Sequence, residues 1–168
     1  MSEQFIGGRS EKRLKHDKYK NYAQHLNDFV KYIKENGVEL YSVSIQNEPD
    51  YALDWTWWTS EEWANFAANY ANQIDCKVRS CKTFQYNKQY YNDILSNSKT
   101  NANIAIAIFG THFYGTQRNQ MDFPALENDP RDIWMTEVYI PNSSSDADIR
   151  LEAIEVAVNI HNDLLSAV

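Results

Sequence analysis

Segments with strand periodicity alternate with segments of helix periodicity along most of the chain, and this order restricts the possible folds more than any other feature. The apolar spacing of residues 17–36 predicts an amphipathic helix that ends at Gly37, and residues 38–46 alternate with the two-residue period of a strand. A capping-box pattern then predicts a second helix over about 60–72.

Three more strands and one more helix follow in the same order. The predicted strands cover residues 77–80, 104–110 and 132–139, a polar aromatic stretch occupies residues 84–91, and a final helix with one broad apolar stripe begins near Asp148. Strands that alternate with helices through short loops form parallel sheets. The sequence therefore predicts an α/β fold, and no dinucleotide-binding glycine pattern or phosphate loop follows any strand.

A (β/α) barrel fits this alternation, but a whole barrel of this kind needs about 250 residues. The chain has 168 residues and four predicted strands, so it corresponds to an interior part of a barrel. No internal repeat or linker divides it. We therefore interpret residues 1–168 as one partial barrel domain.

The charge and composition narrow the classes of partner. The net charge is −7, from 23 acidic and 16 basic side chains, and a negative field repels nucleic acid and anionic membranes. We expect neither as a partner, and the sequence shows no membrane span or secretory signal of its own. Aromatic residues make up 14% of the chain, which favours flat apolar platforms for a neutral ligand.

The two cysteines lie too far apart for a disulfide if their segment is a strand. Cys76 and Cys81 are five residues apart, which places their side chains on opposite faces at about 16 Å. Since a disulfide needs Cα atoms within about 7 Å, we expect two free thiols.

Two predicted strands end with a glutamate, at Glu48 and at Glu137. Carboxyl ends of parallel barrel strands meet at one mouth, where barrel enzymes keep their catalytic groups. Glycoside cleavage needs one carboxylic acid to protonate the leaving oxygen and one carboxylate to attack the anomeric carbon, and it needs no metal or organic cofactor. Either glutamate taken alone is more simply explained as a solvated strand-end carboxylate.

Longer motifs decide between these interpretations. QNEPD, FQYNK, GTHFYG and WMTEVYIPNS occur in an order and spacing that resemble glycoside hydrolase family 30, and most closely its glucuronoxylanase subfamily. The resemblance begins near Arg13 and continues to the end of the chain. It implies a (β/α)8 TIM barrel with a side β-domain, of which this chain covers roughly the fourth to the seventh strand and none of the side domain. It also implies retaining endo-hydrolysis of β-1,4-xylan that carries glucuronic acid branches.

The resemblance assigns roles to individual residues. It makes Glu48 the general acid/base and Glu137 the nucleophile. It implies that seven further residues bind substrate, namely Asn47, Trp55, Tyr86, His112, Tyr114, Tyr139 and Ser143. For the neighbouring Trp57 and Trp58, a place in the cleft and a place in the core are both open. No metal ligand is implied.

The chain also departs from the family pattern. Lys82 stands at a position that is usually acidic; if its side chain reaches the cleft, it would lower the pKa of nearby carboxylates and weaken Glu48 as an acid. The first three strands, the eighth strand, the side domain and the arginine that in the family grips glucuronic acid have no counterpart. We therefore expect this piece alone to be neither a stable nor an active barrel.

Alternatives remain beside the xylanase interpretation. One is another specificity of the same family, such as xylobiohydrolase or glucosylceramidase-like activity. Another is a carbohydrate-binding remnant without activity, and a third is an acidic structural protein without a ligand. For the enzyme we expect xylan as the partner, a monomer in the full-length form, and an extracellular location, because xylan is too large to enter a cell.

Overall fold

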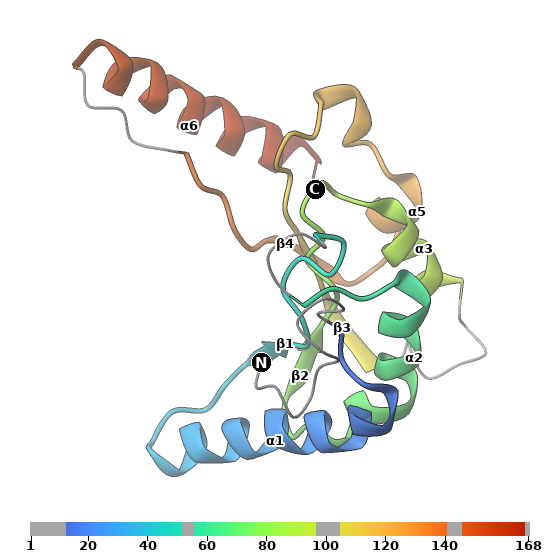
Figure 1. Cartoon of the computed structure of the whole chain (residues 1–168). Helices are drawn as coiled ribbons and strands as arrows, with labels where there is room; N and C mark the ends of the chain where they lie inside the picture. The colour runs from blue at the N-terminus through green and yellow to red at the C-terminus, as the bar shows by residue number, and fades with distance from the viewer. Residues whose placement is uncertain (1–12, 52–55, 97–104, 141–145, 167–168) are drawn as a thin grey trace.

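A four-stranded parallel sheet is the centre of the fold (Figure 1). The computed structural model describes residues 13–51, 56–96, 105–140 and 146–166. Within these residues the strands are β1 (Ser42–Ser44), β2 (Lys77–Arg79), β3 (Ile106–Thr111) and β4 (Asp132–Met135). Each strand pairs in parallel with the next one in sequence, in the order β1-β2-β3-β4. Consecutive strands of a (β/α) barrel have this order, so the predicted α/β topology is confirmed.

Helices cover one face of the sheet. The helices α1 (Tyr19–Glu35), α2 (Ser60–Tyr70) and α3 (Lys88–Leu95) pack in one apolar core with the strands. Short turns of 3-10 helix precede α1 (η1, His16–Lys18), extend α2 (η2, Ala71–Gln73) and follow β3 (η3, Arg118–Gln120). The short α5 (Pro124–Glu127) and the long α6 (Asp146–Ser166) flank β4 in sequence. Among the described helices, none has the length and apolarity required to cross a membrane.

Aromatic side chains dominate the core beneath the helices. Trp58 is 1% exposed, its ring stacks on Tyr19 at 5.4 Å, and it meets Phe66 edge-on at 5.2 Å. Trp58 is therefore a core residue, which settles one of the two undecided tryptophans. The hydroxyl of Tyr22 donates to the carbonyl of Ile45 at 2.7 Å, so α1 is also tied to the chain just after β1.

Local sequence signals set both ends of the first two helices. Gly37 has φ +87°, and its N–H donates to the Lys34 carbonyl at 3.0 Å, as expected for a helix that ends at a glycine. At α2 the predicted capping box is present: Thr59 Oγ1 accepts from the Glu62 N–H at 3.1 Å, and Glu62 Oε2 accepts from the Thr59 N–H at 2.9 Å. The two cysteines are free, as predicted.

Three sequence predictions need correction. The strand expected over 38–46 is limited to Ser42–Ser44, because β1 pairs only with the three residues of β2 and Val38 and Tyr41 stay exposed. The polar aromatic stretch at 84–91 contains the start of α3, which Asn87 caps by accepting from the Gln89 N–H at 3.2 Å. The strand expected over 132–139 ends at Met135, so Glu137 follows the strand.

The last helix forms as predicted, but its apolar side chains are not buried. Ile154, Val158, Leu164 and Leu165 are all at least half exposed. In Figure 1, α6 extends away from the sheet instead of covering it as α1 and α2 do. The predicted apolar stripe is therefore a surface feature of this structure.

The capping box gives a direct stability test. Replacing Thr59 with alanine removes the acceptor for the Glu62 N–H, and we expect the free energy of unfolding to fall by about 1 kcal/mol. Urea denaturation followed by far-UV circular dichroism measures this difference. Ser60→Ala changes the neighbouring residue without removing a cap and should leave the midpoint almost unchanged. Equal midpoints for Thr59→Ala and the parent chain would show that the capping box does not stabilise the fold.

Candidate active site

Glu48 is held at the carboxyl end of β1 by backbone pairing with the segment after β2. Its N–H donates to the Lys82 carbonyl at 3.0 Å, and Asn47 forms a parallel bridge with Lys82. Glu48 has φ +43°, an uncommon conformation for a residue with a side chain. The surrounding pairing thus maintains a strained backbone that turns the carboxyl group into the protein, where Glu48 is 2% exposed.

The partner of Glu48 is His112, which follows β3. Its Nδ1 lies 2.8 Å from Glu48 Oε1, and its ring is fully buried. Burial lowers the pKa of His112 to about 4, so the imidazole is neutral at neutral pH. The contact is accordingly a hydrogen bond between a neutral ring and a carboxyl group, and it fixes the direction in which Glu48 points.

The environment also makes Glu48 a weak acid. Burial and, to a smaller extent, the negative charges of Glu137 and Asp50 together raise the pKa of Glu48 to about 7, while Lys82 acts in the opposite direction. Lys82 does reach the site, as considered from the sequence. Its effect is smaller than that of burial, so Glu48 keeps the raised pKa that a general acid needs near neutral pH.

Glu137 lies two residues beyond β4 and is exposed. The end of β4 stays aligned with β3 because the Thr136 N–H donates to the Thr111 carbonyl at 3.1 Å. The hydroxyl of Tyr114 donates to Glu137 Oε1 at 3.2 Å. Burial and the charge of Glu137 raise the pKa of Tyr114 to about 12, so the phenol keeps its proton and remains a donor to the carboxylate.

The three side chains Glu48, His112 and Glu137 meet at one point. One ligand-type atom from each lies within 4.8 Å of the other two. These donors also suit a divalent cation by distance and chemistry. However, His112 Nδ1 and Glu48 Oε1 already satisfy each other, so we assign no metal ligand here. The arrangement pairs a buried carboxyl group with an exposed carboxylate across a short gap.

The remaining predicted residues lie at different places. Asn47 is half-buried, and its Oδ1 is buried without a hydrogen-bond partner among the described residues. Tyr86 is 4% exposed and packs edge-on against Phe113 at 4.8 Å; it lines a separate polar cavity of about 390 Å³. Tyr139 is exposed. Trp55 and Ser143 lie outside the described residues.

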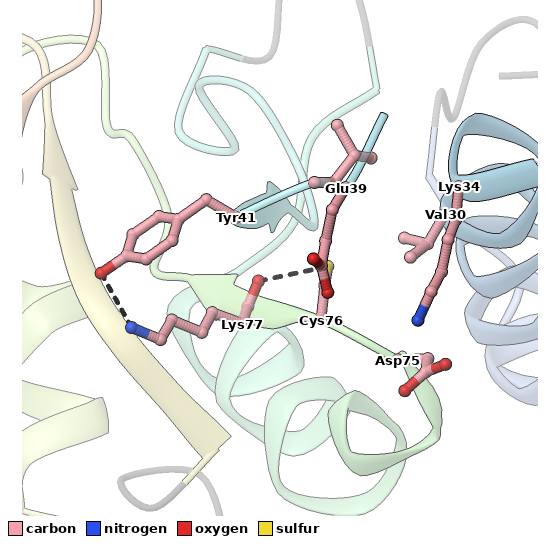
Figure 2. A pocket seen from close by; sticks show the side chains of 8 residues that line it. Val30, Lys34, Glu39, Tyr41, Asp75, Cys76 and Lys77 are labelled. Carbon is pink, nitrogen blue, oxygen red and sulfur yellow. Dashed lines mark hydrogen bonds between the residues drawn. The ribbon is translucent and has the colours of Figure 1, made fainter. Parts of the chain in front are cut away.

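A cavity of similar size lies at the opposite end of the strands (Figure 2). It has a volume of about 400 Å³ and is lined by the end of α1 and the chain that enters β1 and β2, including Lys34, Glu39 and Asp75. Figure 2 shows Lys77 donating to the hydroxyl of Tyr41, at 2.8 Å. None of the predicted site residues lines this cavity. In barrels this end of the strands contributes to stability, whereas catalysis takes place at the other end.

Comparison with known proteins identifies the family. The chain is 48% identical over 162 residues to the glucuronoxylanase XynC of Bacillus subtilis strain 168. Among solved structures, a GH30 endoxylanase from Clostridium papyrosolvens C71 superposes with a TM-score of 0.83 at 40% identity, over 92% of this chain and 39% of that one. The family 30 subfamily 8 xylanase Xyn30A from Clostridium acetobutylicum gives 0.77 at 31% identity, with the same coverage of both chains. No family model matches the sequence.

The chain belongs to glycoside hydrolase family 30. The match to XynC covers 95% of this chain but only 38% of the length of that relative. Its parallel sheet is accordingly part of the family 30 α/β fold, as the motifs predicted.

Sequence reasoning missed two residues of this family 30 site. Asp50 Oδ1 accepts from the Phe84 N–H at 2.8 Å, which ties the loop after β1 to the loop after β2, and its charge adds to the raised pKa of Glu48. Gly110 leaves room for the stem of Lys82. The final residue of the motif QNEPD was a signal for Asp50, and Gly110 is the first residue of the motif GTHFYG, although the motif does not show its contact with Lys82.

The electrostatic account of Glu48 predicts a coupled titration. Because the charge of Glu137 raises the pKa of Glu48, Glu137→Gln should lower the midpoint at which Glu48 titrates from about 7 toward the ordinary value. Carbon-13 NMR of the side-chain carboxyl groups measures this midpoint. Glu155→Gln removes an exposed charge on α6 and serves as the control. If Glu137→Gln leaves the midpoint where it is, burial alone sets the pKa and the two carboxyl groups are not coupled.

Proposed function

We propose that this chain carries the catalytic pair of a retaining glycoside hydrolase that cleaves β-1,4-xylosidic bonds in xylan, including glucuronate-branched xylan. The observation that supports it most is the short gap between a buried carboxyl group, Glu48, and an exposed carboxylate, Glu137. Retaining glycosidases hold two carboxyl groups about 5–5.5 Å apart, whereas inverting ones leave about 6.5–9.5 Å for a water molecule. The oxygens within 4.8 Å favour retention.

In the first step, Glu48 donates its proton to the glycosidic oxygen while Glu137 attacks the anomeric carbon. The bond to the leaving sugar breaks, and Glu137 becomes a glycosyl ester. The ester carries no charge, so one of the groups that raised the pKa of Glu48 is gone. Glu48, now ionised, is then suited to take a proton from the water that hydrolyses the ester.

Neighbouring groups fit the needs of this reaction. Tyr114 orients the attacking carboxylate through its hydrogen bond to Glu137. His112 fixes the acid through its contact with Glu48. The buried Oδ1 of Asn47 lacks a partner among the described residues, and an acceptor of this kind suits a sugar hydroxyl beside the reacting carbon.

The substrate class rests on the relatives, since glucuronoxylanase and xylanase are the activities in their names. A xylose backbone is uncharged, which agrees with a chain of net charge −7. We extend the proposal to an extracellular location, because a polysaccharide of this size stays outside the cell, and to a monomeric full-length enzyme that acts without a cofactor.

The first test is product release from glucuronoxylan. Although the missing strands argue against activity of the piece alone, a chain with a working catalytic pair should release branched xylo-oligosaccharides, detected by mass spectrometry, and proton NMR should show the β-anomer forming first. Glu137→Gln should release none, because the nucleophile is gone. EDTA should leave the rate unchanged if the pair acts without a metal. A folded chain that binds xylan without releasing products would instead be a carbohydrate-binding protein.

The acid role of Glu48 is tested separately. Glu48→Gln should slow xylan hydrolysis by roughly 10²–10⁴-fold, which is the range for loss of a general acid or base. An aryl xyloside with a good leaving group needs no proton, so its first step should survive and the glycosyl-enzyme should accumulate. Added azide should then restore turnover and give a β-glycosyl azide.

Glu39→Gln is the matched control for this variant, since Glu39 lies in the cavity of Figure 2 at the other end of the strands. Its rates should equal those of the parent chain. Equal losses for the aryl xyloside and for xylan in Glu48→Gln, without an azide effect, would show that Glu48 does not act as the acid.

A further inference from the structure

Lys82 is attached to the catalytic acid through the backbone. It lies just after β2, and its carbonyl accepts the N–H of Glu48 at 3.0 Å. Asn47, next to the acid, pairs with Lys82 in a parallel bridge. This pairing joins the β1 end to the β2 end, so the backbones of Lys82 and Glu48 keep a fixed relative placement.

A glycine in the neighbouring strand makes room for the lysine stem. A Cβ added to Gly110 would lie 2.8 Å from Lys82 Cγ, closer than real Cβ contacts. The position of Gly110 is itself fixed, because its N–H donates to Ser80 Oγ at 3.0 Å and its carbonyl accepts from the Tyr91 hydroxyl at 3.0 Å. The missing side chain at Gly110 thus lets Lys82 lie across β3 beneath the site.

Charged groups face this region from every strand end. Glu48 is faced by Glu137 beyond β4, by Asp50 on its own loop, by Lys82 beyond β2, and by the neutral His112 beyond β3. Lys82 is half-buried, and no carboxylate among the described residues lies within the 4.0 Å of an ion pair. Its charge acts on Glu48 and Glu137 together, at longer range, instead of neutralising one of them.

We infer that Lys82 tunes the catalytic pair: its ammonium group, anchored beside Glu48 by backbone pairing and with its stem seated against Gly110, stabilises negative charge on both carboxyl groups. The inference rests on the proposed function. It gives Lys82 its largest effect in the second half of the reaction. When Glu137 has become an ester, its opposing charge is gone while that of Lys82 remains, so Glu48 ionises more readily and acts as the base.

The lysine thus shifts the balance between the two roles of Glu48. It makes Glu48 a slightly stronger acid and helps it to become a base. As a consequence, activity on the alkaline side is lost at a lower pH. An acidic residue at this position would have the opposite effect, since it would add a third negative charge beside Glu48. Lys82 is therefore a determinant of the working pH and not only a surface substitution.

The test compares Lys82→Gln with Lys82→Arg, using Lys31→Gln on the exposed face of α1 as the control. Loss of a unit charge at this range should raise the titration midpoint of Glu48 by about 0.5–1 pH unit, measured by carbon-13 NMR. The alkaline limb of the pH profile for xylan hydrolysis should move to higher pH by the same amount. Lys82→Arg keeps the charge and should match the parent, as should Lys31→Gln.

Gly110→Ala provides a second variant that changes no charge. By displacing the lysine stem, it should raise the Glu48 midpoint in the same direction as Lys82→Gln does. Circular dichroism and the NMR spectrum show whether each variant is folded. An unchanged midpoint in folded Lys82→Gln, or equal shifts in Lys82→Arg and Lys82→Gln, would overturn the inference. A shifted midpoint in a chain that hydrolyses no xylan would instead leave the charge coupling in place and refute the proposed function.

Discussion

Backbone pairing that continues beyond the last residues of the strands is the constraint on which the site depends. The segments after β1 and β2 pair through Glu48 and Lys82, and the segment after β4 pairs with the last residue of β3 through Thr136 and Thr111. The Ser80 N–H completes the series by donating to Ile108 at 2.9 Å. Two carboxylates repel each other, so the approach of the two glutamates is not held by their own contact. It comes from parallel ladders that bring four strand ends to one edge.

Different burial of the two glutamates turns this proximity into two roles. Glu48 points inward because its backbone adopts a positive φ, and the contact with His112 holds it there. Glu137 stays exposed and accepts from Tyr114. The same residue type therefore stands in two different environments, one buried and one exposed. A buried carboxyl group beside an exposed carboxylate is the arrangement that acid and nucleophile roles require.

The sequence predicted what depends on local signals and missed what depends on distant contacts. The capping box at Thr59 and the glycine end of α1 were found because each is encoded within four residues. Strand lengths were overestimated. The length of β1 is limited by the three residues of β2 that pair with it and not by its own alternating pattern. Helix α3 was missed because it has only eight residues and contains an aromatic pair, so the helical spacing of its apolar residues is weak. Glu48 and Glu137 were found through their motifs, whereas Gly110 matters only through its contact with a side chain from the segment after β2.

The cations along β2 show why the charge of Lys82 acts on the catalytic pair. Three cations lie along or just beyond β2, at Lys77, Arg79 and Lys82. Lys77 lies over the ring of Tyr41 at 4.1 Å, and Arg79 lies 5.9 Å from the ring of Trp134, while these two rings stack at 5.8 Å. Two of the cations thus face aromatic rings, which stabilise a positive charge. Lys82 makes no such ring contact in the described part of the chain, and the negative charges that act on it are those of the two catalytic glutamates. Lys82, at the end of the series, therefore keeps its charge available to the two glutamates of the site.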